Sequence, residues 1–366
     1  MRRSYSTVTT VFMASIFSLL MLTGCEGPAG PQGAAGTNGT DGIDGVDGVN
    51  AAETCTDCHT ADTKIKARQV QWAASTHAIG GNFERGGSRT CAACHSHEGF
   101  VERIASGLTQ PDSGFPNPSP INCRTCHQIH TNYDDTDWAF TTGSDVAFDL
   151  WIDGTTVDFG KGNVCANCHQ QRNSYTVPDL AGGDITITSS RFGGHYGAQA
   201  ATMQGAGYVE FTGALSYPTA PHFHEGGDAC VTCHMAKAYG SQAGGHTWNM
   251  TYDSHGATEP NLAGCATCHT DTANWEALGY VGLTNHFDYK GTQTAIQTLL
   301  DDIVAKLIAA NIVDPLDLTH AVPGTYTATV AGAFWNYINI LNDRSLGVHN
   351  PDYVTVLLTN TLAALP

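Results

Sequence analysis

The pattern Cys-x-x-Cys-His occurs six times between residues 55 and 269, and it constrains the chain more than any other feature. Two thiols three positions apart and a histidine directly after the second share one face of a helical turn. Such a turn can bond both vinyl groups of one porphyrin while the histidine reaches its iron, so the pattern is the attachment signature of a c-type haem. A zinc site or a redox dithiol does not require the histidine in every copy.

The motifs predict the covalent and proximal ligands of six haem c groups. The thioether cysteines are Cys55, Cys58, Cys91, Cys94, Cys123, Cys126, Cys165, Cys168, Cys230, Cys233, Cys265 and Cys268. The proximal histidines are His59, His95, His127, His169, His234 and His269. No residue pattern indicates a catalytic group.

Methionine is too scarce to supply the second axial ligand of each iron. Only Met203, Met235 and Met250 follow the expected leader, whereas histidine is abundant at 17 residues. Bis-histidine ligation is therefore expected, and histidine in place of methionine lowers the reduction potential. The distal ligands predicted from local context are His77, His130, His195, His222, His246 and His349.

Other histidines remain in competition for these distal positions. His224 is the alternative to His222, and His286 is the alternative to His349. The remaining histidines, interpreted as non-ligating, are His97, His255 and His320.

The octet Cys123–His130 carries a second histidine three positions after its proximal one. His127 and His130 lie too close along the chain to bind opposite sides of one iron. We therefore expect them to serve two different irons and to hold two haems close together, as a junction in the electron path.

Residues 51–290 contain few continuous aliphatic runs and much Gly, Asn, Asp and Thr. Such a segment buries too little apolar surface to offset its conformational entropy, so we expect the porphyrins to supply the core. The predicted fold is mainly α with extensive loops and few or no strands, wrapped around the haems. A helix is predicted over 64–76, leading into His77.

Residues 291–366 have a different character and predict a C-terminal helical segment packed on the haem domain. Apolar residues recur at helical spacing over 292–311, and further helices are predicted over 330–341 and 351–365. Asn350 suits the N-cap of the last helix, and Pro351 suits its first turn.

Residues 1–24 have the pattern of an export signal, with Arg2 and Arg3 before a short apolar core. The core ends in Leu22-Thr23-Gly24-Cys25, which resembles the lipobox of bacterial lipoproteins. The resemblance implies that Cys25 is lipidated and anchors the chain to a membrane, with outer-membrane sorting. Ordinary cleavage that leaves a free Cys25 is the alternative.

Residues 25–50 carry glycine at every third position from Gly27 to Gly48, the collagen period. We interpret this collagen-like tract as an extended linker rather than a trimeric triple helix. The tract is short, and proline occurs only in its first two triplets.

Acidic residues outnumber basic ones by 34 to 16, a net charge of −18 that becomes −20 without the leader. This surface disfavours nucleic acid as a partner. Cationic partners, metal ions or oxidised minerals approach it more easily.

With these motifs the chain resembles the multihaem c-type cytochromes that metal-reducing bacteria place on their outer surface. The resemblance implies a low-potential electron carrier, exported and lipid-anchored to the outer membrane, facing the cell surface or the periplasm. Its partners would be redox partner cytochromes or extracellular metal and mineral acceptors.

The segment Asp343–Pro351, which contains His349, resembles more weakly the start of a ligand helix in pentahaem nitrite reductases and their octahaem relatives. Those enzymes attach an open haem through Cys-x-x-Cys-Lys, which this sequence lacks. Two alternatives therefore stand beside the carrier. One is a reductase of nitrite, hydroxylamine or a sulfur oxyanion with one five-coordinate haem, and the other is a homo-oligomeric filament.

Overall fold

The computed structural model describes residues 59, 63–148, 154–219, 224, 227–270 and 288–366. The expected leader, Cys25, the glycine-repeat linker, Cys55 and Cys58 lie outside the described residues. His222 and His286 lie outside them as well.

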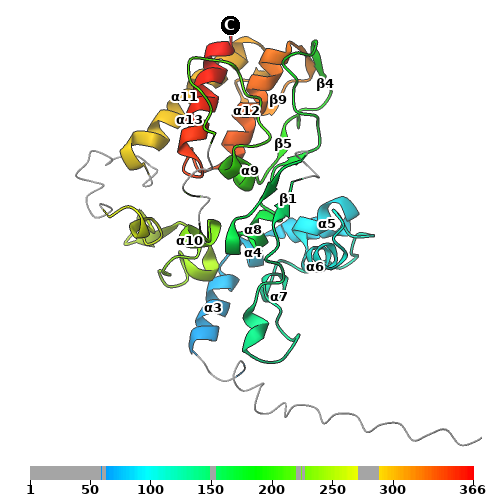
Figure 1. Ribbon diagram of the computed structural model, residues 1–366, viewed down its shortest axis with the longest axis vertical. Helices are drawn as coiled ribbons and strands as arrows, with labels where there is room; N and C mark the ends of the chain where they lie inside the picture. The colour runs from blue at the N-terminus through cyan, green and yellow to red at the C-terminus, as the bar shows by residue number, and fades with distance from the viewer. Residues whose placement is uncertain (1–58, 60–62, 149–153, 220–223, 225–226, 271–287) are drawn as a thin grey trace, which may run out of the picture. The chain divides into compact units, whose positions relative to one another are not determined.

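Short helices and turns carry the chain up to residue 270, and longer helices form its C-terminal part (Figure 1). The α-helices are α3 (Thr63–Ala73), α4 (Thr76–Ile79), α5 (Arg89–His95), α6 (His97–Ser106), α7 (Cys123–Cys126), α8 (Asn163–Ala166), α9 (Gln199–Gln204), α10 (Cys230–His234), α11 (Thr292–Ala309), α12 (Ala328–Asp343) and α13 (Pro351–Ala364). The helix predicted over 64–76 is thus α3, which ends at Ala73, and a separate turn, α4, carries His77. Within the described ranges, no helix is long and apolar enough to cross a membrane.

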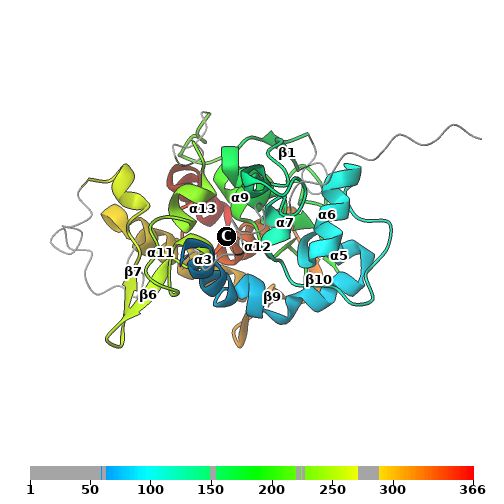
Figure 2. The same ribbon diagram turned by 90° about the horizontal axis from the view of Figure 1, so that it is seen from below.

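The strands of the described residues form small two-stranded antiparallel sheets (β1–β2, β3–β5, β4–β10, β6–β7 and β8–β9). Their bounds are β1 (Val146–Ala147), β2 (Thr156–Val157), β3 (Arg172–Asn173), β4 (Ile185–Ile187), β5 (Gly194–His195), β6 (Thr251–Ser254), β7 (Ala257–Pro260), β8 (Val313–Asp314), β9 (Asp317–Ala321) and β10 (Gly324–Tyr326). The β6–β7 hairpin is visible in Figure 2. The predicted secondary-structure class, mainly helical with loops and few, short strands, is confirmed.

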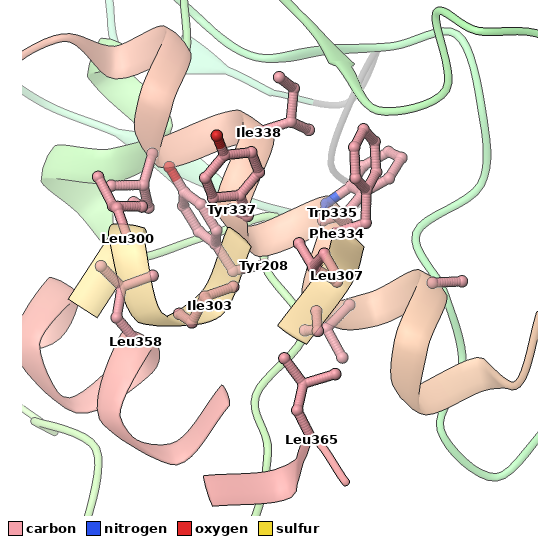
Figure 3. Close-up of a cluster of buried hydrophobic side chains, with 14 of the residues drawn as sticks. Tyr208, Leu300, Ile303, Leu307, Phe334, Trp335, Tyr337, Ile338, Leu358 and Leu365 are labelled. Carbon is pink, nitrogen blue, oxygen red and sulfur yellow. The ribbon is translucent and has the colours of Figure 1, made fainter. Parts of the chain in front are cut away.

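The three C-terminal helices α11, α12 and α13 pack against one another (Figure 1). Helix α11 buries Ile296, Leu300, Ile303 and Leu307, which the helical period places on one face. Helix α12 is buried on nearly all sides, because its side chains meet both other helices and the preceding loops (Figure 3). The helices predicted in this region are confirmed.

The N-cap of α13 is also confirmed. The Asn350 side chain accepts a hydrogen bond from the backbone N–H of Tyr353 at 3.1 Å, and Pro351 occupies the first turn. This cap fixes the start of α13 directly after His349.

The core of these helices also includes residues from before the predicted boundary at 290. Ile187, Phe192 and Phe211 are buried in it. The buried Asn336 side chain bonds the backbone of Val209 in both directions, accepting from its N–H at 2.8 Å and donating to its carbonyl at 2.7 Å. These bonds attach the loop that precedes the fifth Cys-x-x-Cys-His motif to α12.

Candidate haem-binding sites

Each described motif lies on a short helical turn, as its spacing predicts. The first cysteine of four motifs lies on α5, α7, α8 or α10, and the sixth motif begins with a 3₁₀ turn over Cys265–Thr267. In three motifs a hydrogen bond closes the turn: the backbone N–H of the motif histidine donates to the carbonyl of the first cysteine at 2.8–2.9 Å. The three pairs are His127–Cys123, His169–Cys165 and His269–Cys265. The turn therefore presents the two cysteines and the histidine together.

Each of the six histidines predicted to be proximal ligands faces a second histidine. The ring centroids are 6.1 Å apart for His59–His130 and His77–His169, 6.2 Å for His95–His195, 6.3 Å for His127–His246, and 6.4 Å for His224–His269 and His234–His349.

These separations fit one iron between each pair of rings. With about 2.0–2.1 Å from metal to imidazole nitrogen and roughly 1.1 Å from nitrogen to ring centre, two axial histidines have centroids about 6.3 Å apart. The cysteines of every described motif adjoin the proximal histidine. The residues present therefore fit a haem c with two histidine ligands at the second to sixth motifs, and at the first motif the described His59 and His130 fit the two axial positions.

Five of the histidines predicted as distal ligands occupy these facing positions: His77, His130, His195, His246 and His349. His222, the sixth prediction, lies outside the described residues, and its stated alternative His224 faces His269. The His224 ring is held by a hydrogen bond from Nδ1 to the Val348 carbonyl at 2.8 Å. Nothing in the sequence near His224 reveals this acceptor, because it lies on a distant segment.

The histidines interpreted as non-ligating have other partners or are exposed. His97 Nδ1 lies 3.0 Å from the Thr125 hydroxyl. His320 Nδ1 lies 2.8 Å from an Asp317 carboxylate oxygen, and His255 is exposed. None of the described ring contacts brings any of them opposite a motif histidine.

The octet Cys123–His130 directs its two histidines to different partners. His127 faces His246, whereas His130 faces His59. His130 has a φ of 68°, and its backbone N–H donates to the buried carboxylate of Asp137 at 2.7 Å. This geometry is the one expected of two histidines that serve different irons.

Hydrogen bonds fix the tautomer of several paired histidines. Nδ1 of His127, His224 and His234 donates to the carbonyls of Trp138, Val348 and Trp248 at 2.7, 2.8 and 3.0 Å. A carbonyl can only accept, so the proton is on Nδ1 and the lone pair that can bind a metal is on Nε2. Second partners of this kind are typical of metal-binding histidines.

Burial keeps two distal candidates in the neutral form that binds metal. It lowers the pKa of His77 and that of His246 to about 4. His349 differs, because the charge and hydrogen bond of Asp343 outweigh burial and raise its pKa. A neutral imidazole is required for ligation, so His77 and His246 need no deprotonation near pH 7.

Three of the candidate sites meet at Trp248. Its ring lies 4.7 Å from that of His77 and 5.8 Å from that of His246, and its carbonyl accepts the bond from His234. Its φ of 56° is uncommon for a bulky residue. The sites of the third, fourth and fifth motifs are therefore close neighbours.

Contacts between motifs show which other sites are adjacent. Cys168 Sγ lies 3.9 Å from the Ala93 carbonyl, and Cys94 Sγ lies 3.9 Å from the Asn167 carbonyl, so the second and fourth motifs touch reciprocally. A Cβ on Gly264 would lie 2.7 Å from the Cα of Cys233, which places the sixth motif against the fifth.

Comparison with known proteins shows what the chain is similar to. Residues 48–137, which contain the first three motifs, match the cytochrome c3 family. Comparison with curated protein sequences yields no match. The predicted resemblance to multihaem c-type cytochromes is confirmed.

Among solved structures, the chain is similar to the outer cell wall cytochrome OcwA, with a TM-score of 0.50 and 20% sequence identity. The similarity covers 82% of this chain and 50% of that one, so the chain spans about half the length of OcwA. At 20% identity, this similarity shows a shared fold and no more.

Proposed function

We propose that the chain is an electron carrier that binds six haem c groups, each between two histidines, and works at low potential outside the cytoplasm. The observation that carries the proposal is the set of facing histidines, each pair separated by 6.1–6.4 Å. A bound haem supplies a one-electron centre that cycles between ferric and ferrous iron. The chain's own residues attach it, orient it and set its neighbours.

The protein side chains perform these tasks in a definite way. The motif cysteines hold each porphyrin by two bonds, and the proximal histidine follows on the same turn. The hydrogen bonds to Nδ1 fix the ring orientation and leave Nε2 directed away from the acceptor. The contacts between motifs around Trp248 and Cys168 keep the sites close enough for electrons to pass from one to the next.

A carrier explains the facing histidines better than a reductase does. A reductase of nitrite, hydroxylamine or a sulfur oxyanion needs an iron with one open position, but every motif histidine here has a histidine opposite. Histidine at both axial positions in place of methionine favours a low potential.

The location and partners of the carrier form part of the same proposal. Lipidation of Cys25 anchors the chain to the outer membrane, and the collagen-like linker extends the haem domain away from it. The surplus of acidic residues suits cationic metal or mineral acceptors and redox partner cytochromes with basic surfaces.

The test is a count of haems and of their spin states in the exported protein. The intact mass should correspond to six thioether-bound haems, and the ferric spectrum should be entirely low-spin. A double variant, Cys123→Ala with Cys126→Ala, should lose one haem. A smaller wild-type count would overturn the assignment of six haems. A high-spin fraction whose spectrum shifts when nitrite or cyanide is added would overturn the carrier in favour of the reductase.

A further inference from the structure

One paired histidine has a carboxylate as its hydrogen-bond partner. His349 Nδ1 lies 2.6 Å from Asp343 Oδ1, and the Asp343 side chain is completely buried. The other described Nδ1 bonds of paired histidines, those of His127, His169, His224 and His234, go to neutral oxygens. In the charge of its Nδ1 acceptor, His349 therefore differs from these four histidines.

The carboxylate is held in place by the loop between α12 and α13. Asp343 is the last residue of α12, and its Oδ2 accepts hydrogen bonds from the hydroxyl and the backbone N–H of Ser345. The Ser345 hydroxyl in turn accepts from the backbone N–H of His349 at 3.3 Å. Among the described residues, no lysine or arginine forms an ion pair with Asp343. Its two carboxylate oxygens are therefore divided between the His349 ring, at Oδ1, and the neutral donors of Ser345, at Oδ2.

We propose that Asp343 lowers the reduction potential of the haem bound between His234 and His349. This inference rests on the proposed function. A buried carboxylate that accepts the Nδ1 proton increases electron donation by the imidazole to the iron and adds negative charge nearby. Both effects stabilise the ferric over the ferrous state, and the low dielectric of the site preserves them. Asp343 is a positioning residue that acts through His349.

The location of the site gives this difference a consequence for electron flow. The fifth motif contacts the sixth through Gly264 and Cys233, and it shares Trp248 with the third and fourth. The described contacts thus place this site between the sixth motif and the third and fourth, on a route by which electrons would pass between them. A lower reduction potential there makes electron transfer onto this haem less favourable from either side. Asp343 therefore sets how unfavourable that transfer is.

The test is a redox titration of the holoprotein carrying Asp343→Asn, which keeps the shape of the side chain and removes its charge. One component of the titration should move to higher potential, with the haem count unchanged and the ferric iron still low-spin. Asp317→Asn is the matched control, since Asp317 also pairs with a histidine, His320, but at an exposed position. It should leave every component in place.

A second variant protects the test against a folding failure. Ser345→Ala removes a donor that competes for the Asp343 charge, so the same component should move to lower potential. If both variants load all haems and titrate like the wild type, the inference is wrong while the carrier function stands. If the wild type itself lacks haems or is partly high-spin, the proposed function fails instead.

Discussion

Replacement of His246 by alanine tests the pairing on which the haem sites depend. His246 faces His127 across 6.3 Å, and the 3₁₀ turn Gly245–Thr247 presents it. The side chain of Gln71 accepts a hydrogen bond from the His246 backbone N–H at 3.1 Å, so the turn stays attached to α3 after the ring is removed. The change therefore removes one iron ligand without removing the support of the turn.

The magnitude follows from the number of pairs. One pair of six loses its distal ring, so about one sixth of the ferric haem should change from low-spin to high-spin. The open position should bind cyanide at one equivalent per chain, whereas the wild type should bind none at the same concentration. Absorption and electron paramagnetic resonance spectra of the purified ferric protein measure both quantities.

His255→Ala is the control, because His255 is exposed and the described ring contacts place it opposite no motif histidine. Its spectra should match the wild type. The reasoning is refuted if His246→Ala remains fully low-spin with all haems attached, or if His255→Ala produces the same high-spin fraction.

Other expectations concern the ring planes, the apolar core and the role of haem in folding. The planes of the paired rings meet at 23°, 38° and 39° in three pairs and at 61°, 76° and 77° in the other three. The low-spin signals in electron paramagnetic resonance should therefore divide into two groups. A single group would contradict these geometries. Leu307→Ala empties a fully buried position, so the free energy of unfolding should fall by about 2–5 kcal/mol in denaturant titrations. Leu316→Ala, at a position 95% exposed, should change it by less than about 0.5 kcal/mol. Without haem attachment, hydrogen exchange should find protected amides in α11–α13 and unprotected ones over 63–137; equal protection of both would show that haem is not the missing core.

The local parts of each site could be predicted from the sequence. The motif spacing and one helical turn decide where the cysteines and the proximal histidine lie, and no distant residue takes part. The C-terminal helices could also be predicted from the sequence. In α11, for example, Ile296, Leu300, Ile303 and Leu307 recur at helical spacing. Helix α12 is longer than predicted because Thr327 caps it, accepting from the Val330 N–H at 3.3 Å.

The parts that depend on distant segments could not be predicted in the same way. His222 and His224 are two residues apart in a loop, where no period distinguishes them, and the choice of His224 depends on a carbonyl at Val348. The pairing of β4 with β10 joins residues 185–187 to residues 324–326, and no pattern in either segment predicts this contact. Asp343 precedes His349 by six positions in the sequence, but that spacing does not predict their hydrogen bond. The bond depends on the conformation of the loop through Ser345, which places the carboxylate beside the ring.

The order of the sites in space differs from the order of the motifs in the chain, and this difference bears on stability. His77 precedes the second motif but faces His169 of the fourth, and His349 near the C-terminus faces His234 of the fifth. An iron between such rings closes a long loop, and each closure restricts the unfolded chain more than it restricts the folded one. In residues 63–270, where apolar runs are few, bound haems would by these closures supply part of the stabilisation that a hydrophobic core gives α11–α13. The residues that set the electron path are thus also those that hold this part of the chain together, so the loss of one distal histidine should loosen segments far from it in sequence.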